Sequence, residues 1–255
     1  MTVTYISTED AVASDDLCMT VVSSVPSPWG EAAKGILHVK GLSWNAVRYN
    51  PMDKAQSDWA GGYANAPTLV PAGEPPINGW REILSFAETV QPDPVLIPKD
   101  QSELCISLSE KFCGSDGLGW HRRLLGIHAG LTGQGGFSLP IAQYLGMKYG
   151  YSADRMEETE TRIVALIAEF SARLQSQKAA GSLYFIGNAL SCVDIYSACF
   201  MAMYDPLPED QCAMHPKSRA VFTQRYPNVD SDFDPISLAH RDYIYEQYLN
   251  LPLSL

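Results

Sequence analysis

The 255-residue sequence predicts an α/β domain followed by an all-α domain. Over the first part of the chain, short apolar runs alternate with segments of helical spacing. A proline-rich stretch at residues 91–98 then follows, as is typical of an interdomain linker. From Asp100 onward the strand signals largely disappear and helical spacing dominates. We therefore place one domain at about residues 17–92 and the other at about residues 99–250.

The first domain begins with a strand, a helix and a second strand. Residues 17–22 form a short apolar run with β-branched side chains, which indicates a buried strand. Residues 29–40 carry apolar positions at a spacing of three and four, which predicts a helix that ends at Gly41. Residues 43–49 alternate in the manner of a strand. This order over such a short length predicts a βαβ unit with two parallel strands.

The remainder of the first domain shows weaker signals and one clear helix. Residues 53–63 are weakly helical, residues 66–70 read as a third strand, and Ile77 fits a short fourth strand. Residues 80–89 place their apolar side chains on one helical face, which predicts an amphipathic helix before the linker.

The second domain is predicted to be helical throughout. The helical segments are residues 102–112, 120–131, 154–177 and 193–204, and the glycine-rich residues 132–151 between them are a loop or a broken helix. Ser191 and Asp194 form a variant of the capping box, in which the hydroxyl and the carboxylate satisfy backbone N–H groups at the start of the last helix.

The composition limits the function classes. The chain is 46% hydrophobic and 18% charged, as expected for a globular protein. Eighteen basic against 29 acidic residues give a net charge of -11, which argues against nucleic acid or an anionic membrane as a partner. The first 16 residues lack the basic start and apolar middle of a secretory signal, and no apolar run approaches a membrane span. The six cysteines form no CxxC pair, so we expect buried, reduced thiols and a cytoplasmic location.

Four segments in this order resemble the cytosolic glutathione transferase superfamily. They are residues 25–42 (VPSPWGEAAKGILHVKGL), residues 65–69 (NAPTL), the 80–89 helix with its linker, and residues 183–195 (LYFIGNALSCVDI). The resemblance implies a thioredoxin-like N-terminal domain, an all-α C-terminal domain and a homodimer. It also implies an enzyme that activates the thiolate of glutathione for attack on a small electrophile.

Ser27 is the residue that the resemblance places at the reacting sulfur. It stands thirteen residues before Lys40, where zeta-like members of the superfamily carry a catalytic serine and omega-like members a cysteine. A hydroxyl at a helix N-terminus can hydrogen-bond a thiol sulfur and, with the helix dipole, favour the thiolate. The alternative is that Ser27 only caps the helix, with Pro28 as its first residue. The resemblance also implies a contact between glutathione and Trp29.

The resemblance also implies that glutathione contacts the first domain at Ala66 and Pro67. Pro67 resembles the cis-proline of the superfamily, whose preceding residue, here Ala66, presents its backbone to the cysteinyl part; an ordinary trans-proline is the alternative.

Gly79 and Trp80 stand where members of the superfamily carry Glu/Gln-Ser for the γ-glutamyl group, so both the carboxylate and the hydroxyl are missing. Backbone N–H groups of the helix could still bind a carboxylate there, with help from Asn78 or Arg81, and Trp80 would pack or form a wall.

The second domain offers residues for the pocket of the electrophile. Trp120 would form an apolar wall, and Arg122 or Arg123 would meet an anionic group; alternatively, the two arginines pair with the acidic surface. His121 and His128 lie two helical turns apart without a third ligand, so no metal site is expected.

Two functions therefore remain open from the sequence. The chain is either a glutathione transferase-like enzyme or a non-catalytic ligand-binding or structural protein of the same fold that has lost the usual glutathione site. A role as a subunit of a larger assembly has only the analogy of fold behind it.

Overall fold

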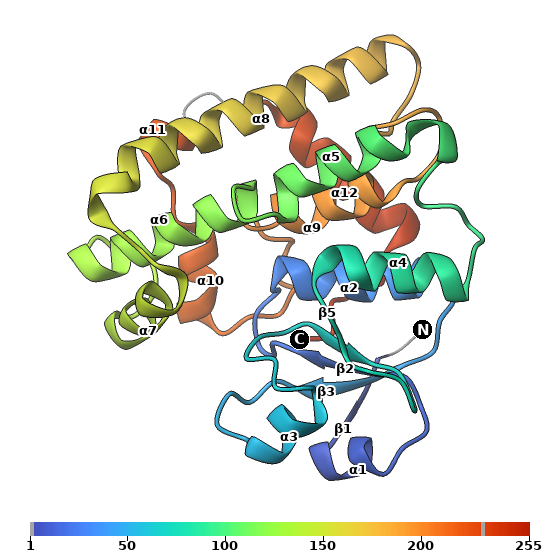
Figure 1. Ribbon diagram of the computed structural model, residues 1–255. Coiled ribbons are helices and arrows are strands. Elements are labelled where there is room, and N and C mark those ends of the chain that lie inside the picture. Colours follow the sequence, from blue (N-terminus) through green and yellow to red (C-terminus); the bar gives the residue numbers. More distant parts are fainter. Residues whose placement is uncertain (1–2, 231–232) are drawn as a thin grey trace. The chain divides into compact units, whose positions relative to one another are not determined.

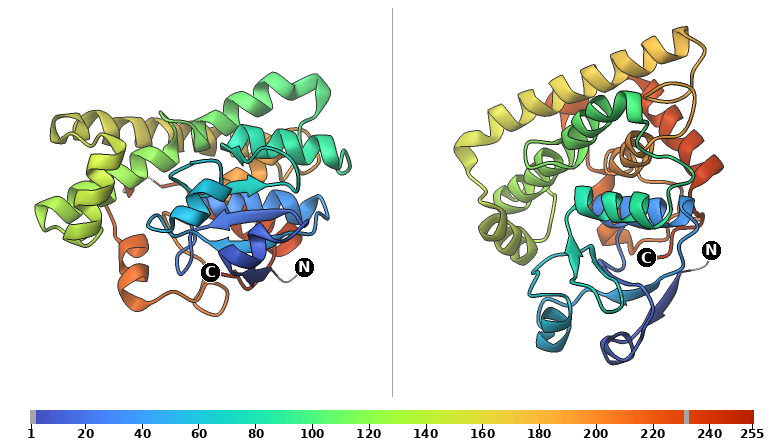
Figure 2. Two further views of the ribbon diagram at one scale, coloured as in Figure 1. Left: turned by 60° about the horizontal axis from the view of Figure 1, so that its bottom comes forward. Right: turned by 45° about the vertical axis from the view of Figure 1, so that its right-hand side comes forward.

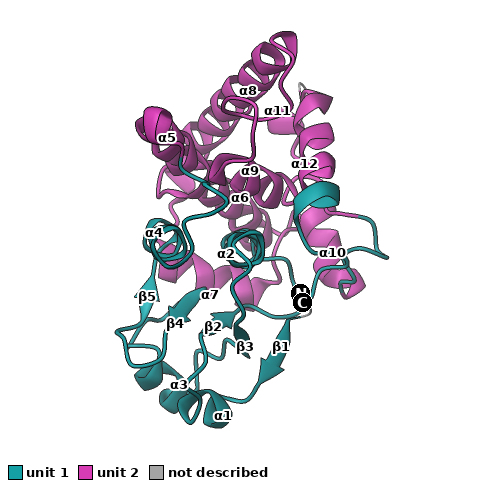
Figure 3. Cartoon of the chain, turned by 90° about the vertical axis from the view of Figure 1, so that its right-hand side faces the viewer, with its two compact units in different colours: residues 1–97, 208–214, 245–255 teal, residues 98–207, 215–244 magenta. Residues whose placement is uncertain are grey.

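The computed structural model describes residues 3–230 and 233–255 and divides into two compact units (Figure 3). Unit 1 contains the chain up to Ile97 together with residues 208–214 and 245–255. Unit 2 contains residues 98–207 and 215–244. The division after Ile97 lies in the proline-rich stretch. The two late segments of unit 1 differ from the sequence-based boundaries, because the hydrophobic pattern carries no signal for a tail that returns to the first unit.

Unit 1 is an α/β unit built on one mixed sheet. Its elements are β1 (Thr4–Ile6), α1 (Thr8–Val12), β2 (Cys18–Val21), α2 (Pro28–Val39), β3 (Asn45–Arg48), α3 (Lys54–Trp59), β4 (Thr68–Val70), β5 (Ile77–Asn78) and α4 (Trp80–Val90). The strand order is β1-β3-β2-β4-β5, with the first three strands parallel and β4 and β5 each antiparallel to their neighbours. The predicted parallel pair is β2 and β3.

Helices cover both faces of this sheet. Helices α2 and α4 pack together on one face, and α1 and α3 lie on the other (Figure 1). Met19, Leu37 and Leu69 are fully buried, and a smaller cluster of Ala11 and Val47 with Cys18 lies beneath α1. β1 and α1 were not predicted, because segments of three and five residues are too short to show a hydrophobic period.

Lys40, at the end of α2, attaches the linker to the sheet unit. Its fully buried ammonium donates to the carbonyl oxygens of Pro92, at 3.1 Å, and Pro94, at 2.7 Å, and it pairs with Glu88. A buried ammonium requires such partners, because it has lost its hydration. The Lys40 side chain therefore fixes the path of the chain beyond α4.

Unit 2 is helical. Its helices are η1 (Lys99–Gln101), α5 (Ser102–Cys113), α6 (Leu118–Thr132), α7 (Leu139–Tyr149), η2 (Ala153–Arg155), α8 (Met156–Ala179), α9 (Cys192–Met201), α10 (Pro216–Thr223), α11 (Pro227–Asp230) and α12 (Pro235–Tyr248), whose residues from Tyr245 onward belong to unit 1. The long α8 packs along α6 (Figure 2). The core of unit 2 contains the stacked rings of Phe112 and Phe170, with Phe185 and Phe200 beside Phe112.

The predicted capping box at the start of α9 is present and is larger than predicted. One carboxylate oxygen of the fully buried Asp194 accepts from the N–H and the hydroxyl of Ser191, at 2.8 and 2.7 Å. The other oxygen accepts from the N–H of Phe185, at 2.7 Å, and contacts Nε2 of His240 at 3.0 Å. The carboxylate thus joins three segments of unit 2.

Candidate functional site

Ser27 begins α2 but does not cap it with its side chain. Its backbone is extended (φ -66°, ψ 119°), Pro28 is the first helical residue, and the Ser27 carbonyl accepts from the N–H of Glu31 at 2.8 Å. The half-buried hydroxyl makes no hydrogen bond to any residue that the structure describes. A hydroxyl beside the positive end of a twelve-residue helix is thus available to a ligand.

The sheet places the loop before Ser27, the Ala66–Pro67 bond and the start of α4 at one edge. Thr20, near the carboxyl end of β2, is paired with Thr68 at the beginning of β4, and Thr68 is paired with Asn78 at the end of β5. The chain leaves β2 at this end to reach Ser27. In sheets with parallel strands, ligands bind outside the carboxyl ends of those strands. The candidate site lies at this edge.

The Ala66–Pro67 bond is cis, as the resemblance implies. Thr68, the next residue, donates its N–H to the hydroxyl of Thr20 at 3.0 Å. The Asn78 amide nitrogen lies 3.0 Å from the Pro67 carbonyl and 2.8 Å from the Thr68 hydroxyl. Among the described residues, nothing hydrogen-bonds the N–H or the C=O of Ala66. Asn78 therefore positions the loop, and the Ala66 backbone remains available to a ligand.

Glu82, which was not among the predicted site residues, places a carboxylate at the start of α4. Gly79 has φ 109° and ψ 141°, a backbone conformation that residues other than glycine rarely adopt. A Cβ at this position would meet Glu82 Oε2 at 2.2 Å. The Glu82 carboxylate thus folds back over the positive end of the helix. The signal in the sequence is an acid three residues after the helix start. Trp80 is half-buried, with the Arg81 guanidinium 5.2 Å from its ring centre.

The cysteines of the chain are all buried and present no exposed thiol at this edge. All six cysteines are buried thiols rather than disulfides, as expected. Burial raises the pKa of the Cys18 thiol and, more strongly, that of Cys113. These sulfurs are therefore kept protonated, the less nucleophilic state.

In unit 2, Arg122 is buried and, within the described part of the chain, does not pair with an acidic surface residue, which was one of its two predicted roles. Arg122 is only 4% exposed, and one terminal nitrogen of its guanidinium donates to the Gln224 carbonyl at 3.1 Å. The guanidinium carbon lies 4.5 Å from the Tyr226 ring centre and 5.3 Å from that of Tyr204. No carboxylate of the described residues pairs with it, and its Nε lacks an acceptor.

Arg123 and Trp120 lie in an aromatic cluster of unit 2. The Arg123 guanidinium carbon is 5.1 Å from the ring centres of both Trp120 and Tyr149. The two rings meet edge to face at 4.7 Å. Tyr149 ends α7, which occupies the region predicted as a loop or broken helix.

The two histidines on α6 have separate partners. His121 Nε2 contacts Asp116 at 2.9 Å, and His128 Nδ1 contacts the Tyr151 hydroxyl at 2.6 Å. Over residues 3–230 and 233–255, no group of three or more potential ligands that could hold a metal ion is found. Likewise, none of the helices described is long and apolar enough to cross a membrane.

The chain is similar in structure to solved proteins over almost its whole length. No family model and no curated protein matches the sequence. A glutathione transferase family member from Pseudomonas fluorescens with two glutathione molecules bound has a TM-score of 0.61 at 12% identity, covering 93% of this chain and 94% of its own.

Two further solved structures that are similar to this chain are also glutathione transferases. A glutathione S-transferase from Methylobacterium radiotolerans, in complex with glutathione sulfonate, has a TM-score of 0.58 at 18% identity over 91% of both chains. An omega glutathione transferase from Trametes versicolor has a TM-score of 0.51 at 14% identity over 95% of this chain and 96% of its own.

These matches confirm the fold that the sequence motifs imply. Unit 1 contains the mixed sheet and unit 2 is helical. The chain has the glutathione transferase fold, a thioredoxin-like domain followed by an all-α domain.

Proposed function

We propose that this chain is a glutathione-dependent transferase that uses Ser27 to hold the thiolate of glutathione for attack on a small electrophile. The observation that carries the proposal is the unengaged Ser27 hydroxyl at the N-terminus of α2, at the carboxyl edge of β2. Glutathione bound in proteins of the same fold supports the choice of thiol.

The proposed chemistry needs no ionisation of the serine. The glutathione thiol releases its proton to solvent, and the thiolate then accepts a hydrogen bond from the Ser27 hydroxyl next to the positive end of α2. The sulfur attacks the electrophilic carbon and forms a C–S bond, and the leaving group departs with its electron pair. The hydroxyl therefore lowers the pKa of the bound thiol by stabilising its charged form.

The remaining contacts follow from groups at the same edge. The N–H and C=O of Ala66 would bind the cysteinyl part of the peptide, whose backbone offers the complementary groups. The Glu82 carboxylate would accept from the γ-glutamyl ammonium, and N–H groups of Gly79 and Trp80 would bind the neighbouring carboxylate.

Substitution Ser27→Ala tests the proposal. Turnover of glutathione with a chloronitrobenzene should fall roughly 10- to 100-fold, below the loss of about 10²–10³ for a strong oxyanion contact, because sulfur accepts hydrogen bonds weakly. The pH profile should also move to higher pH, since the bound thiol loses a partner of its charged form. The exposed Ser85→Ala, on α4, is the matched control and should leave the rate unchanged. Unaltered turnover and pH profile in Ser27→Ala would contradict the proposal.

A non-catalytic function is the second candidate, and the absence of Glu/Gln-Ser at Gly79 and Trp80 favours it. Calorimetry with free glutathione at pH 7 separates the two. Binding in the micromolar range supports the transferase, whereas millimolar or weaker binding supports a protein that has kept the fold and lost the glutathione site.

We also propose that the chain is a homodimer, as the resemblance implies. Sedimentation equilibrium at micromolar concentration should give twice the mass of one chain, and a monomer mass would overturn this part of the proposal.

A further inference from the structure

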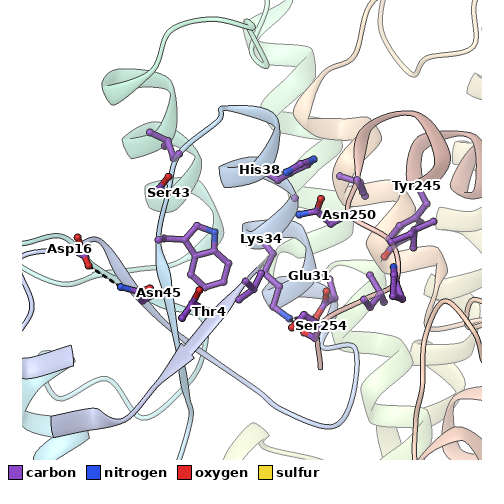
Figure 4. A pocket seen from close by; sticks show the side chains of 18 residues that line it. Thr4, Asp16, Glu31, Lys34, His38, Ser43, Asn45, Tyr245, Asn250 and Ser254 are labelled. Carbon is purple, nitrogen blue, oxygen red and sulfur yellow. Dashed lines mark hydrogen bonds and ion pairs between the residues drawn. The ribbon is translucent and has the colours of Figure 1, made fainter. Parts of the chain in front are cut away.

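A cavity of about 830 Å³ lies within unit 1 (Figure 4). Its volume is within the range of small-molecule sites. It is lined by Thr4 and Asn45, which begin β1 and β3, and by Asp16, which precedes β2. These residues mark the amino ends of the parallel strands, whereas Ser27 follows the carboxyl end of β2. The cavity is therefore at the opposite edge of the sheet from the candidate glutathione site.

One face of α2 supplies buried polar groups to this cavity. Glu31 and Lys34, both more than nine-tenths buried, are joined by an ion pair of 2.8 Å between Oε1 and Nζ. Lys34 also donates to the Ser254 carbonyl at 2.7 Å, so the C-terminal tail closes one side (Figure 4). The second carboxylate oxygen of Glu31 has no donor among the described residues. His38, one turn beyond Lys34, has a buried Nδ1 that also lacks a partner.

Burial sets the charge state of two of these groups. It raises the pKa of the Glu31 carboxyl, although the Lys34 ammonium opposes the change. It lowers the pKa of His38, which favours the neutral imidazole. The Glu31 carboxylate is thus incompletely compensated by the protein, and a cationic partner would stabilise its charged form.

The other groups that line the cavity also favour a positively charged ligand. Asp16 accepts from the Asn45 amide at 3.0 Å and adds a second carboxylate, against the single ammonium of Lys34. Trp44 and Tyr245 contribute aromatic rings to the wall, and such rings attract organic cations. An anionic ligand would instead approach two carboxylates.

We propose that this cavity binds a small organic cation, a protonated amine on an aromatic or apolar body, with its ammonium at the unpartnered oxygen of Glu31 and its body against Trp44. This site uses other side chains than the proposed glutathione chemistry, although the Glu31 N–H donates to the Ser27 carbonyl within α2.

A pair of matched compounds tests the proposal on the full chain. 2-Phenylethylamine and 3-phenylpropionate share a ring and a two-carbon spacer and carry opposite charges at pH 7. By isothermal titration calorimetry the amine should bind at one site, and the carboxylate should bind at least tenfold more weakly. Equal binding of the two compounds, or no saturable binding of the amine, would overturn the proposal.

Variants locate the site. Glu31→Gln keeps the shape of the side chain and removes its charge, and it should weaken binding of the amine roughly tenfold or more, as loss of a desolvated charge contact does. Should this variant fail to fold, Asp16→Asn at an exposed position should weaken binding a few-fold. Ser27→Ala should leave binding of the amine unchanged. Unaltered affinity in a folded Glu31→Gln, or loss of affinity in Ser27→Ala, would show that the amine binds elsewhere.

Discussion

Among the helices that have a serine as N-cap, α9 and α2 differ in what their serine hydroxyl contacts. At α9, fully buried Ser191 is bound to Asp194, and the Asp194 carboxylate contacts two more segments. At α2, half-buried Ser27 has an unengaged hydroxyl. The difference lies three residues on, where α9 has Asp194 and α2 has Gly30, which has no side chain to complete a capping box. The third helical residue thus decides whether the serine stabilises the fold or is available to a ligand.

We expect the largest effect on the free energy of unfolding at the start of α9. Asp194→Ala leaves four donor contacts without an acceptor in a fully buried place, and we expect a loss of about 3–5 kcal/mol in the free energy of unfolding. Urea unfolding followed by circular dichroism measures it. Ser191→Ala removes only the hydroxyl and should cost about 1 kcal/mol. A loss below about 1 kcal/mol in Asp194→Ala would mean that the cluster contributes no more than an ordinary cap.

A third helix start, that of α4, sharpens the comparison. Its third residue is the acidic Glu82, and its cap is a glycine at φ 109°. Gly79→Ala brings a Cβ against the Glu82 carboxylate in a strained backbone, and we expect a loss of about 1–3 kcal/mol. Glutathione binding should weaken as well, since Glu82 is displaced. Thermal unfolding and calorimetry measure the two effects; wild-type stability would show that the turn relaxes without strain.

Converting the available serine into a capped one is the direct test of the comparison. A Cβ at Gly30 would lie 3.7 Å from that of Ser27, an ordinary contact, so Gly30→Asp can place a carboxylate at the start of α2. We expect a gain of roughly 0.5–1 kcal/mol from the new cap and the loss of a helical glycine. Turnover with glutathione should fall, because the carboxylate engages Ser27 and repels the thiolate. Gly30→Ala is the control for the glycine alone, and undiminished turnover in Gly30→Asp would contradict the assigned role of Ser27.

The smallest effect on stability is expected at Ser27 itself. Since its hydroxyl makes no cap hydrogen bond, Ser27→Ala should change the free energy of unfolding by less than about 0.5 kcal/mol. The same variant is expected to lose turnover, so stability and activity separate at this position. A loss of 1 kcal/mol or more would indicate that Ser27 caps α2 after all, which is the alternative that the sequence left open.

Local patterns predicted the framework of the site but not its full set of groups. The resemblance implied positions for Ser27 and for a cis-proline at position 67, and the Ala66–Pro67 bond is cis. Glu82 was missed because a glycine cap hides the usual Ser/Thr signal of a capping box. The pairing of Arg122 was left open by the sequence, since whether a long charged side chain reaches the surface depends on neighbours such as Tyr204 and Tyr226, far along the chain.

The sequence by itself determined the parallel β2–β3 pair, the helices from α2 to α9 apart from α7, and the Asp194 box, because periodicity and caps depend on residues within one or two turns of each other. The tertiary structure alone decided the place of β1, the return of residues 245–255 to unit 1 and the cavity beside Glu31. These features arise where segments far apart in the sequence meet, as Thr4 pairs with Asn45 and Ser254 accepts from Lys34. Such contacts depend on the complementarity of distant surfaces, which leaves no periodic signal in either segment.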